Sequence, residues 1–384
     1  MADADIRELK LLADLESIAD GYEEEFGAPP INLSLWNPAQ NVLKEMELHL
    51  PFSSDLKGIE YTFSYELPER EAVMQALGFD PKTSGSLLTH SGSTAIVATA
   101  NWLKQKGCLS VLIIGPRYFT VPYALASFGI NWTLAYTHRS RAGNFSFPPL
   151  DERALQGVDA VWLTNPVYCT GVDYSEDDCT EFISAMLRLG IQIVLDECLS
   201  ECGRRIGPKF STHGITAIYA PHKAICVNGI KFAAIIFDQS EQEHFDSWCD
   251  VWNGCLPISS VIAVRHFLSP DFVRYRTDFR NITSLRHKKI REVVALTSSI
   301  QLDATAQGYL ISVYAPKIEA KAGLDISFLK RTAKATGAIF IAGARNEMNP
   351  DVGLSFRLNL AAIDTAALAA FTRLCAWLDG PPSS

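Results

Sequence analysis

The chain has 384 residues, of which 48% are hydrophobic and 20% charged, so it can bury a large core. Its formal net charge of −9 argues against the basic face that nucleic-acid binding requires, and no nucleic-acid partner is expected. No apolar run reaches membrane-spanning length, so no membrane association is expected either. The nine cysteines include no C-x-x-C pair, and the acidic first thirty residues contain no apolar leader. Both features favour a reducing, cytoplasmic location without a metal site.

The first two thirds of the chain alternate between strand-like and helical patterns. An amphipathic helix is predicted up to about residue 28, and further helices are predicted after Ser91, from Val121 and after Ser175. The predicted strands cover residues 109–114, 160–163, 191–195, 216–219 and 232–237. Continuous apolar runs of this kind are typical of parallel strands that are buried on both faces. The alternation predicts an α/β fold whose large domain is a doubly wound, mostly parallel sheet.

The last third has a different pattern, which predicts a smaller α+β domain. A long helical pattern begins at about residue 285, and a terminal helix is expected over residues 365–378. Strands are expected at residues 308–314, 338–342 and 354–360. We therefore expect an N-terminal arm with part of the small domain over 1–45, the large domain over 46–275, and the C-terminal small domain over 276–384.

Two residues carry the strongest chemical signal. Lys223 lies between the strand-like runs 216–219 and 232–237, where poor solvation favours the neutral amine, a nucleophile toward carbonyl groups. Asp196 ends the apolar run 191–195, 27 residues before Lys223. A lysine that forms a Schiff base and an aspartate that keeps a ring nitrogen protonated are the two groups that pyridoxal phosphate requires.

Further short motifs occur in a consistent order around these two residues. They are Leu33-Ser34-Leu35-Trp36-Asn37-Pro38, Ser91-Gly92-Ser93-Thr94, Pro116-Arg117-Tyr118, Asn165-Pro166-Val167-Tyr168-Cys169-Thr170-Gly171, Asp196-Glu197-Cys198-Leu199, Ala220-Pro221-His222-Lys223 and Phe356-Arg357-Leu358. In order and spacing they resemble the fold-type I pyridoxal-phosphate enzymes, the aspartate-aminotransferase superfamily, over nearly the whole chain.

The resemblance implies a cofactor site with covalent pyridoxal 5'-phosphate on Lys223 and with Asp196 on its ring nitrogen. Residues implied to bind the phosphate are Gly92, Ser93, Thr94, Lys231 and, from a neighbouring subunit, Tyr61. Residues implied to contact the remainder of the cofactor are Tyr118 by stacking, Tyr168 at the phenolic oxygen and His222 beside the lysine. Each has a structural alternative, such as a small-residue turn that caps a helix, a packed aromatic ring or histidine, or a solvated lysine.

The substrate side of the resemblance rests on Arg357 and Trp36. Arg357 matches the strand arginine that grips a substrate α-carboxylate, and a structural ion pair is its alternative. Trp36 replaces a glycine at the substrate mouth, and its bulk should reshape the pocket. The chain departs from the family pattern elsewhere too: Tyr168, Leu199, Ala220 and Lys231 stand where asparagine, tyrosine, serine and arginine are usual.

The implied reaction starts from an α-amino acid and passes through an external aldimine and an α-carbanion (quinonoid). Transamination is the favoured outcome. The altered positions leave open a lyase, cyclase or carbon–carbon bond-forming enzyme of a secondary pathway, which would use elimination or replacement. A non-catalytic cofactor-binding homologue is a further alternative, against which the joint retention of Lys223, Asp196 and Arg357 argues. The resemblance also implies a homodimer.

Overall fold

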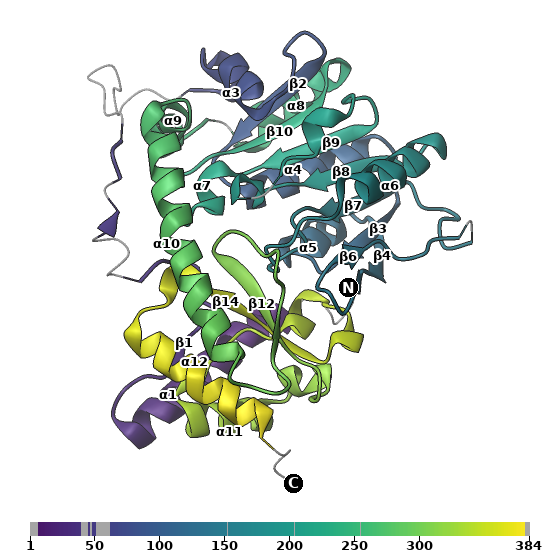
Figure 1. Cartoon of the computed structure of the whole chain (residues 1–384). Helices are drawn as coiled ribbons and strands as arrows, with labels where there is room; N and C mark the ends of the chain where they lie inside the picture. Colours follow the sequence, from purple (N-terminus) through teal and green to yellow (C-terminus); the bar gives the residue numbers. More distant parts are fainter. Residues whose placement is uncertain are drawn as a thin grey trace.

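The computed structural model describes residues 7–39, 45–46, 48–50, 62–151, 153–202, 204–253 and 255–380, with side chains except for 7–13, 202 and 253. It consists of a large lobe that contains the main sheet and a smaller lobe that contains both the N-terminal helix and the C-terminal helix (Figure 1). This arrangement confirms the predicted α/β fold with a doubly wound, mostly parallel large-domain sheet and a smaller α+β domain.

The large lobe is built on a seven-stranded sheet with the order β2-β10-β9-β8-β7-β3-β4. Neighbouring strands are parallel except for β10, which is antiparallel to both β2 and β9. The strands are β2 (Ser84–Thr89), β3 (Ser110–Gly115), β4 (Asn131–Tyr136), β7 (Ala160–Thr164), β8 (Gln192–Asp196), β9 (Ile215–Tyr219) and β10 (Ala233–Asp238). A separate pair, β5 (His138–Arg139) and β6 (Phe145–Ser146), forms a small antiparallel ribbon.

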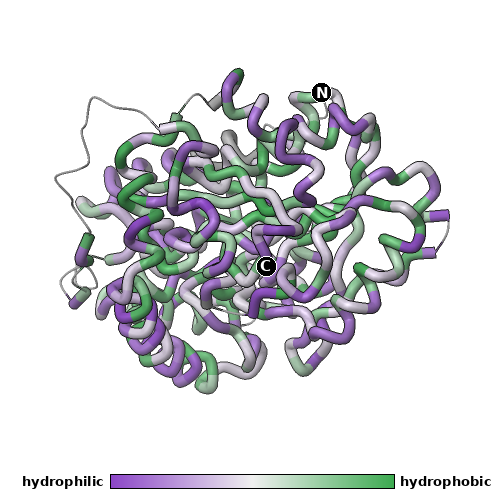
Figure 2. Tube along the Cα trace, turned by 90° about the horizontal axis from the view of Figure 1, so that it is seen from above, coloured by the Kyte–Doolittle hydropathy of each residue, from purple (hydrophilic) through white to green (hydrophobic). Residues whose placement is uncertain are grey.

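Helices cover both faces of this sheet, which explains why its strands read as continuous apolar runs. In β7, Val161 and Leu163 belong to one hydrophobic cluster, whereas Ala160 and Trp162 belong to the other. One face packs against α4 (Gly92–Gln105), α5 (Thr120–Ser127) and α8 (Gln242–Trp248). The other packs against α3 (Arg70–Leu77), α6 (Glu176–Arg188) and α9 (Ile258–Phe267). Seen from above, hydrophobic colour follows the interior strands, while the hydrophilic colour lies mainly on outer helices and loops (Figure 2).

Two helix starts follow directly from serine caps in the sequence. The Ser91 Oγ accepts a hydrogen bond from the Thr94 N–H at 3.2 Å, at the start of α4. The Ser175 Oγ accepts from the Asp178 N–H at 3.0 Å, at the start of α6. Because a serine cap satisfies a backbone donor that the first helical turn leaves free, it fixes where each helix begins.

The small lobe has an antiparallel sheet of β11 (Gln301–Leu302), β12 (Leu310–Ala315) and β14 (Leu354–Asn359). A second pairing joins β1 (Ile31–Asn32) to β13 (Ala338–Ile339) in parallel. Three further helices pack in this lobe: α1 (Arg7–Phe26), α11 (Ile326–Thr336) and α12 (Thr365–Asp379). The N-terminal segment therefore lies beside the C-terminal third of the chain.

The lobes are joined by α10 (Pro270–Val294), a helix of 25 residues. The sequence prediction of a start near residue 285 was wrong, because Ser269 caps the helix and Pro270 occupies its first turn. Phe272, Tyr275 and Phe279 supply the buried stripe between many charged residues. The strand expected over 338–342 is also shorter, since β1 offers only two residues for β13 to pair with.

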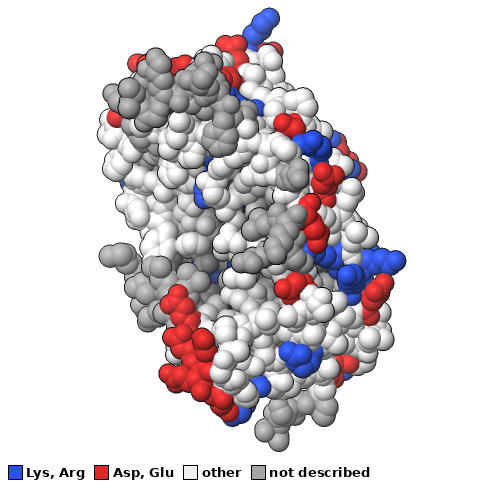
Figure 3. Space-filling view, turned by 90° about the vertical axis from the view of Figure 1, so that its left-hand side faces the viewer, with Lys and Arg blue, Asp and Glu red and all other residues white. Residues whose placement is uncertain are grey.

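Charges are mixed on the face shown in Figure 3, where Asp and Glu gather near one end and Lys and Arg form small separate groups. Among the described residues, no helix combines the length and the apolar character needed to cross a membrane.

Candidate functional site

The residues singled out by the sequence meet at the carboxyl ends of the large-lobe strands. Asp196 is the last residue of β8, and Lys223 lies in the short helix α7 (Pro221–Ala224) that follows β9. Ser91 follows β2, and Tyr118 follows β3. Ligands of open α/β sheets bind at this edge, where loops diverge and backbone groups are available.

A cavity of about 240 Å³ lies between these loops. Its walls come from both lobes and combine two lysines, three residues at the start of α4, aromatic rings and amides. The lining residues are Trp36, Asn37, Ser91, Gly92, Ser93, Tyr118, Ala220, Lys223, Asn228, Lys231 and Phe232.

The amine of Lys223 lies close to the rings of two aromatic side chains. Its Nζ lies 4.1 Å from the centroid of the Tyr118 ring and 5.1 Å from that of Trp36. An ammonium group over aromatic faces is held by the quadrupoles of the rings. The side chain is half-buried, so the amine is positioned by its neighbours yet remains accessible from the cavity.

Asp196 is a buried carboxylate close to this amine. Burial raises its pKa, while hydrogen bonds from Cys198 and the charge of Lys223 act in the opposite direction. The Cys198 N–H donates to its Oδ1 at 3.1 Å. A carboxylate in such surroundings favours a cationic partner, because burial without one is costly.

The opposite end of the cavity is suited to an anion. Ser91, Gly92 and Ser93 bring the start of α4, a 14-residue helix, to the lining, together with Lys231. Burial and the charge of Lys223 lower the pKa of Lys231. Backbone N–H groups at a helix start and a nearby cation attract negative charge. A Cβ on Gly92 would come 3.2 Å from the Cys198 Sγ, so the close packing there favours glycine.

Arg357, on β14, is buried beside the cavity. Its Nη2 donates to the Ser34 carbonyl oxygen at 2.7 Å, and its Nη1 lies 4.0 Å from the Cys169 Sγ. Its Nε is buried and has no hydrogen-bond partner among the described residues. The guanidinium carbon lies 4.2 Å from the centroid of the Trp36 ring. These polar contacts are to neutral groups, since burial raises the pKa of the Cys169 thiol.

Comparison with known proteins identifies the fold. No protein-family model and no curated protein sequence matches the chain. Solved structures do match, and one is a kynurenine aminotransferase from Pyrococcus horikoshii, at 16% identity and a TM-score of 0.75, covering 98% of this chain and 95% of that one. The chain has the aspartate-aminotransferase fold.

Two other structures extend this result. A multiple substrate aminotransferase from Thermococcus profundus matches at 14% identity and a TM-score of 0.75, covering 99% of this chain and 95% of that one. A double mutant of Thermus thermophilus aspartate aminotransferase matches at 15% identity and a TM-score of 0.75, covering 94% of this chain and 96% of that one.

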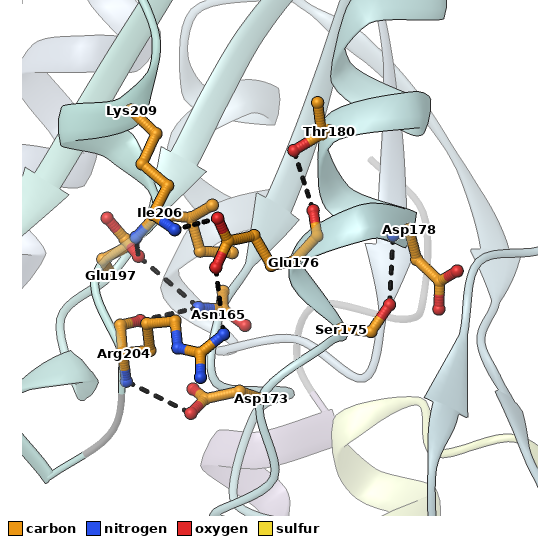
Figure 4. A network of polar contacts seen from close by, with 10 residues as sticks. All are labelled: Asn165, Asp173, Ser175, Glu176, Asp178, Thr180, Glu197, Arg204, Ile206 and Lys209. Carbon is orange, nitrogen blue, oxygen red and sulfur yellow. Dashed lines mark hydrogen bonds and ion pairs between the residues drawn. The ribbon is translucent and has the colours of Figure 1, made fainter.

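Within this aminotransferase fold, a buried network fixes the loops that carry the site. Glu197 accepts hydrogen bonds from the Tyr219 hydroxyl at 2.6 Å and from the N–H groups of Ile206 and Gly207 at 2.7 and 3.0 Å. The Asn165 Nδ2 donates to the same carboxylate at 3.4 Å (Figure 4). Burial raises the pKa of Glu197 to about 6, and these hydrogen bonds counteract the rise. The network ties the loop after β7 to the loop after β8.

Five of the described residues that were predicted for the site do not line the cavity, and one of them is Arg357. The His222 ring is buried and packs against His266, Phe272 and Phe232, of which only Phe232 lines the cavity. Thr94 contributes its N–H to the cap of α4, and Tyr168 is buried with its ring centroid 5.7 Å from that of Tyr118. Asp196 lies behind the lining, near Lys223. A further one, Tyr61, lies outside the described residues.

The structure also brings in residues that the sequence prediction missed. Asn228 lines the cavity, and its Nδ2 donates to the Trp36 carbonyl oxygen at 2.9 Å. Ser91 lines it as the cap of α4, and its position directly before Gly92 was the available signal. Asn228 follows Lys223 by five residues in the same loop, but nothing in its local sequence distinguishes it from an ordinary turn residue.

Proposed function

We propose that this chain is a pyridoxal-phosphate-dependent enzyme that acts on an α-amino acid, and that transamination is its reaction. The observation that carries the proposal is the placement of the Lys223 amine beside buried Asp196 and over Tyr118, in a cavity whose other end has a helix start and Lys231. The aminotransferase fold supports it.

The residues present fit this cofactor. The Lys223 amine would hold its aldehyde carbon, and Asp196 would face its ring nitrogen. Gly92, Ser93 and Lys231 would hold the phosphate, because they bring backbone donors and a cation to one end of the cavity. Tyr118 would cover one face of the ring.

The fit differs from the usual family pattern at the phosphate. Ala220 supplies no hydroxyl, and Lys231 has a point charge in place of the two-pronged guanidinium. Retention of the phosphate then depends more on the start of α4 and on the charge of Lys231. We therefore expect the removal of Lys231 to weaken the binding of the cofactor.

The chemistry follows from the positions of these side chains. Bound pyridoxal phosphate supplies an electron sink for a carbanion at the substrate α-carbon. With the cofactor bound, the Asp196 carboxylate would hold a proton on the ring nitrogen, and the Lys223 amine would remove the substrate α-proton as general base. Arg357 would bind the α-carboxylate: its guanidinium is buried, contacts neutral groups and has no hydrogen-bond partner at Nε among the described residues, so a carboxylate would complete it.

Purified protein loaded with pyridoxal phosphate tests the proposal. Borohydride reduction followed by peptide mapping should place the label on Lys223, and Lys223→Ala should abolish the lysine-bound absorbance. An amino-acid panel should then yield a ketoacid and the amine form of the cofactor. Label on another lysine, Lys231 included, would overturn the site assignment. A product without a ketoacid would favour the lyase alternative, and absorbance that no amine changes would favour a non-catalytic protein.

Asp196 provides a second test of the same site. Asp196→Ala should leave the fold intact and abolish exchange of the substrate α-proton with deuterium, because the ring nitrogen loses the group that keeps it protonated. Exchange at the wild-type rate would contradict the role given to Asp196.

We also propose that the chain forms a homodimer. Val251 and Trp252 are adjacent in the chain and are 75% and 62% exposed, so a second copy could cover this pair of apolar side chains. Sedimentation of the purified protein should give the mass of two chains, and an active monomer would contradict this.

A further inference from the structure

Trp36 separates Arg357 from the cavity. The Arg357 side chain is only 2% exposed, and the indole lies over its guanidinium with 4.2 Å from Cζ to the ring centroid. Trp36 is among the residues that line the cavity, whereas Arg357 is not. A ligand in the cavity therefore meets the indole before it meets the guanidinium.

The same indole extends toward the amine. The Lys223 Nζ lies 5.1 Å from its centroid, and the ring meets Tyr118 edge-on at 6.3 Å and 83°. An α-amino acid that uses both groups must place its nitrogen at Lys223 and its carboxylate at Arg357. Both of these groups lie close to the indole, at 5.1 Å and 4.2 Å from its centroid.

We propose that the Trp36 indole is a gate over the carboxylate site, which must swing aside before a substrate carboxylate can reach Arg357. This inference rests on the proposed function, in which Arg357 binds the α-carboxylate.

The main chain at the gate is anchored, so the moving part is the side chain. The Trp36 carbonyl oxygen accepts from the Asn228 Nδ2 at 2.9 Å and from the Cys226 Sγ at 3.2 Å. On the small-lobe side, the Asn359 Nδ2 donates to the carbonyl oxygens of Leu35 and Asn37 at 2.6 and 3.3 Å. Because both lobes hold this segment, opening occurs by rotation of the indole between rotamers and needs no loop movement.

The exchange of partners at Arg357 explains why a carboxylate would open the gate. The closed indole gives the guanidinium a cation–π contact, but no acceptor in the described part of the chain bonds to the buried Nε. A carboxylate can accept from the Nε and pair with the charge, which is the stronger interaction for a buried guanidinium. A simple amine offers no such pairing and leaves the gate closed. Trp36 thus slows the approach of both carboxylates and arginine reagents to Arg357, and it does not affect the reaction of a simple amine with the cavity.

Chemical modification of Arg357 with phenylglyoxal tests the gate without any need for turnover. Peptide mapping gives the modification rate of each arginine, and Arg204, whose side chain is 62% exposed, serves as the internal standard. In the wild type Arg357 should react much more slowly than Arg204. Trp36→Ala should raise the rate at Arg357 several-fold, and Trp36→Phe, the matched aromatic variant, should keep it slow. Arg286, which is 7% exposed and does not contact Trp36, should stay slow in both variants, which shows that they are folded.

Equal rates at Arg357 in the wild type and Trp36→Ala would overturn the gate, as would a wild-type Arg357 that reacts as fast as Arg204. A stopped-flow measurement on the cofactor-loaded protein gives a second criterion. Trp36→Ala should accelerate the absorbance change caused by an amino acid and leave that caused by a carboxylate-free amine unchanged. Equal acceleration of both would show that Trp36 only narrows the cavity. If the chain binds no pyridoxal phosphate, the proposed function fails, whereas the modification rates still decide whether the indole covers Arg357.

Discussion

The amine of Lys223 lies 4.1 Å from the centroid of the Tyr118 ring. Since Tyr118 also lines the cavity and packs against Trp36, its ring forms a wall next to the reactive amine. This wall can contribute by its aromatic face or by its hydroxyl, and the two contributions are separable by substitution.

Tyr118→Ala should weaken the binding of pyridoxal phosphate, whereas Tyr118→Phe should retain most of it. Aromatic stacking contributes about 0.5–1.5 kcal/mol beyond area burial, so we expect a loss of roughly two- to tenfold in affinity. An absorbance titration of each variant gives the dissociation constants. An equal loss in both variants would assign the contribution to the hydroxyl and not to the ring.

Lys231→Ala should weaken the binding of pyridoxal phosphate but not that of pyridoxal, which lacks the phosphate. A hydrogen bond to a charged group contributes about 1.5–3 kcal/mol, or roughly 10- to 150-fold in affinity. Lys104→Ala, at an exposed position of α4, is the matched control and should change neither ligand. If pyridoxal and its phosphate lose affinity equally in Lys231→Ala, the lysine does not contact the phosphate.

The sequence predicted the elements whose signals are local. The apolar run 191–195 became β8, and the Ser91 and Ser175 caps start helices where the sequence placed them. The first half of α10 was missed because its charged residues obscure the spacing of the buried Phe272, Tyr275 and Phe279.

The directions in which the side chains of adjacent residues point were harder to predict, because they depend on the local backbone conformation. In a helix, successive side chains point about 100° apart, so Lys223 faces the cavity while His222 enters the core. At the end of β8 the side chains of Asp196 and Glu197 diverge, one toward Lys223 and the other toward Tyr219. Trp36 follows β1 and Arg357 lies on β14, so their contact joins two segments that are far apart in the sequence. No local sequence pattern could reveal this contact.

Glu197→Gln should destabilise the fold, although Glu197 does not line the cavity and takes no part in its chemistry. Glu197 is buried and accepts from three donors at 3.0 Å or less, from Tyr219, Ile206 and Gly207. An amide nitrogen in place of one oxygen leaves a buried donor facing another donor, which costs about 1–3 kcal/mol. Urea denaturation gives the change in the free energy of unfolding. Glu181→Gln, at an exposed position of α6, is the control, and a Glu197→Gln variant as stable as this control would contradict the role of the network.

Arg357→Ala should weaken amino-acid binding and leave the absorbance of the lysine-bound cofactor nearly unchanged. Removal of one partner of a buried charge pair costs about 2–5 kcal/mol, or roughly thirty- to several-thousand-fold in affinity. Arg357→Lys should also lose affinity, because a point charge cannot reproduce the two-pronged contact. A simple amine is the control ligand. Equal losses for amine and amino acid would make Arg357 structural.

His222 and His266 form a buried pair, with 2.9 Å between the His222 Nε2 and the His266 Nδ1. Burial lowers the pKa of His222 to about 3, and the charge of His266 adds to this effect. In the unfolded chain a histidine has a pKa of about 6.5. Below that pH the unfolded chain takes up a proton that the folded chain excludes, so the contribution of His222 to stability is complete above pH ~6.5 and decreases as the pH falls toward ~3.

The free energy of unfolding of the wild type should therefore decrease more between pH 7 and pH 5 than that of His222→Gln. The two decreases should differ by about 2 kcal/mol, because over this interval the unfolded wild type binds one proton that the folded wild type does not. Urea denaturation of both proteins at the two pH values gives it, and the contributions of all other groups largely cancel in the comparison. His266 also has a lowered pKa because of burial, and it remains in both proteins. Equal pH dependence in wild type and variant would mean that His222 accepts its proton in the folded chain as readily as in the unfolded one, and that the apolar surroundings of Phe232 and Phe272 do not exclude the charge.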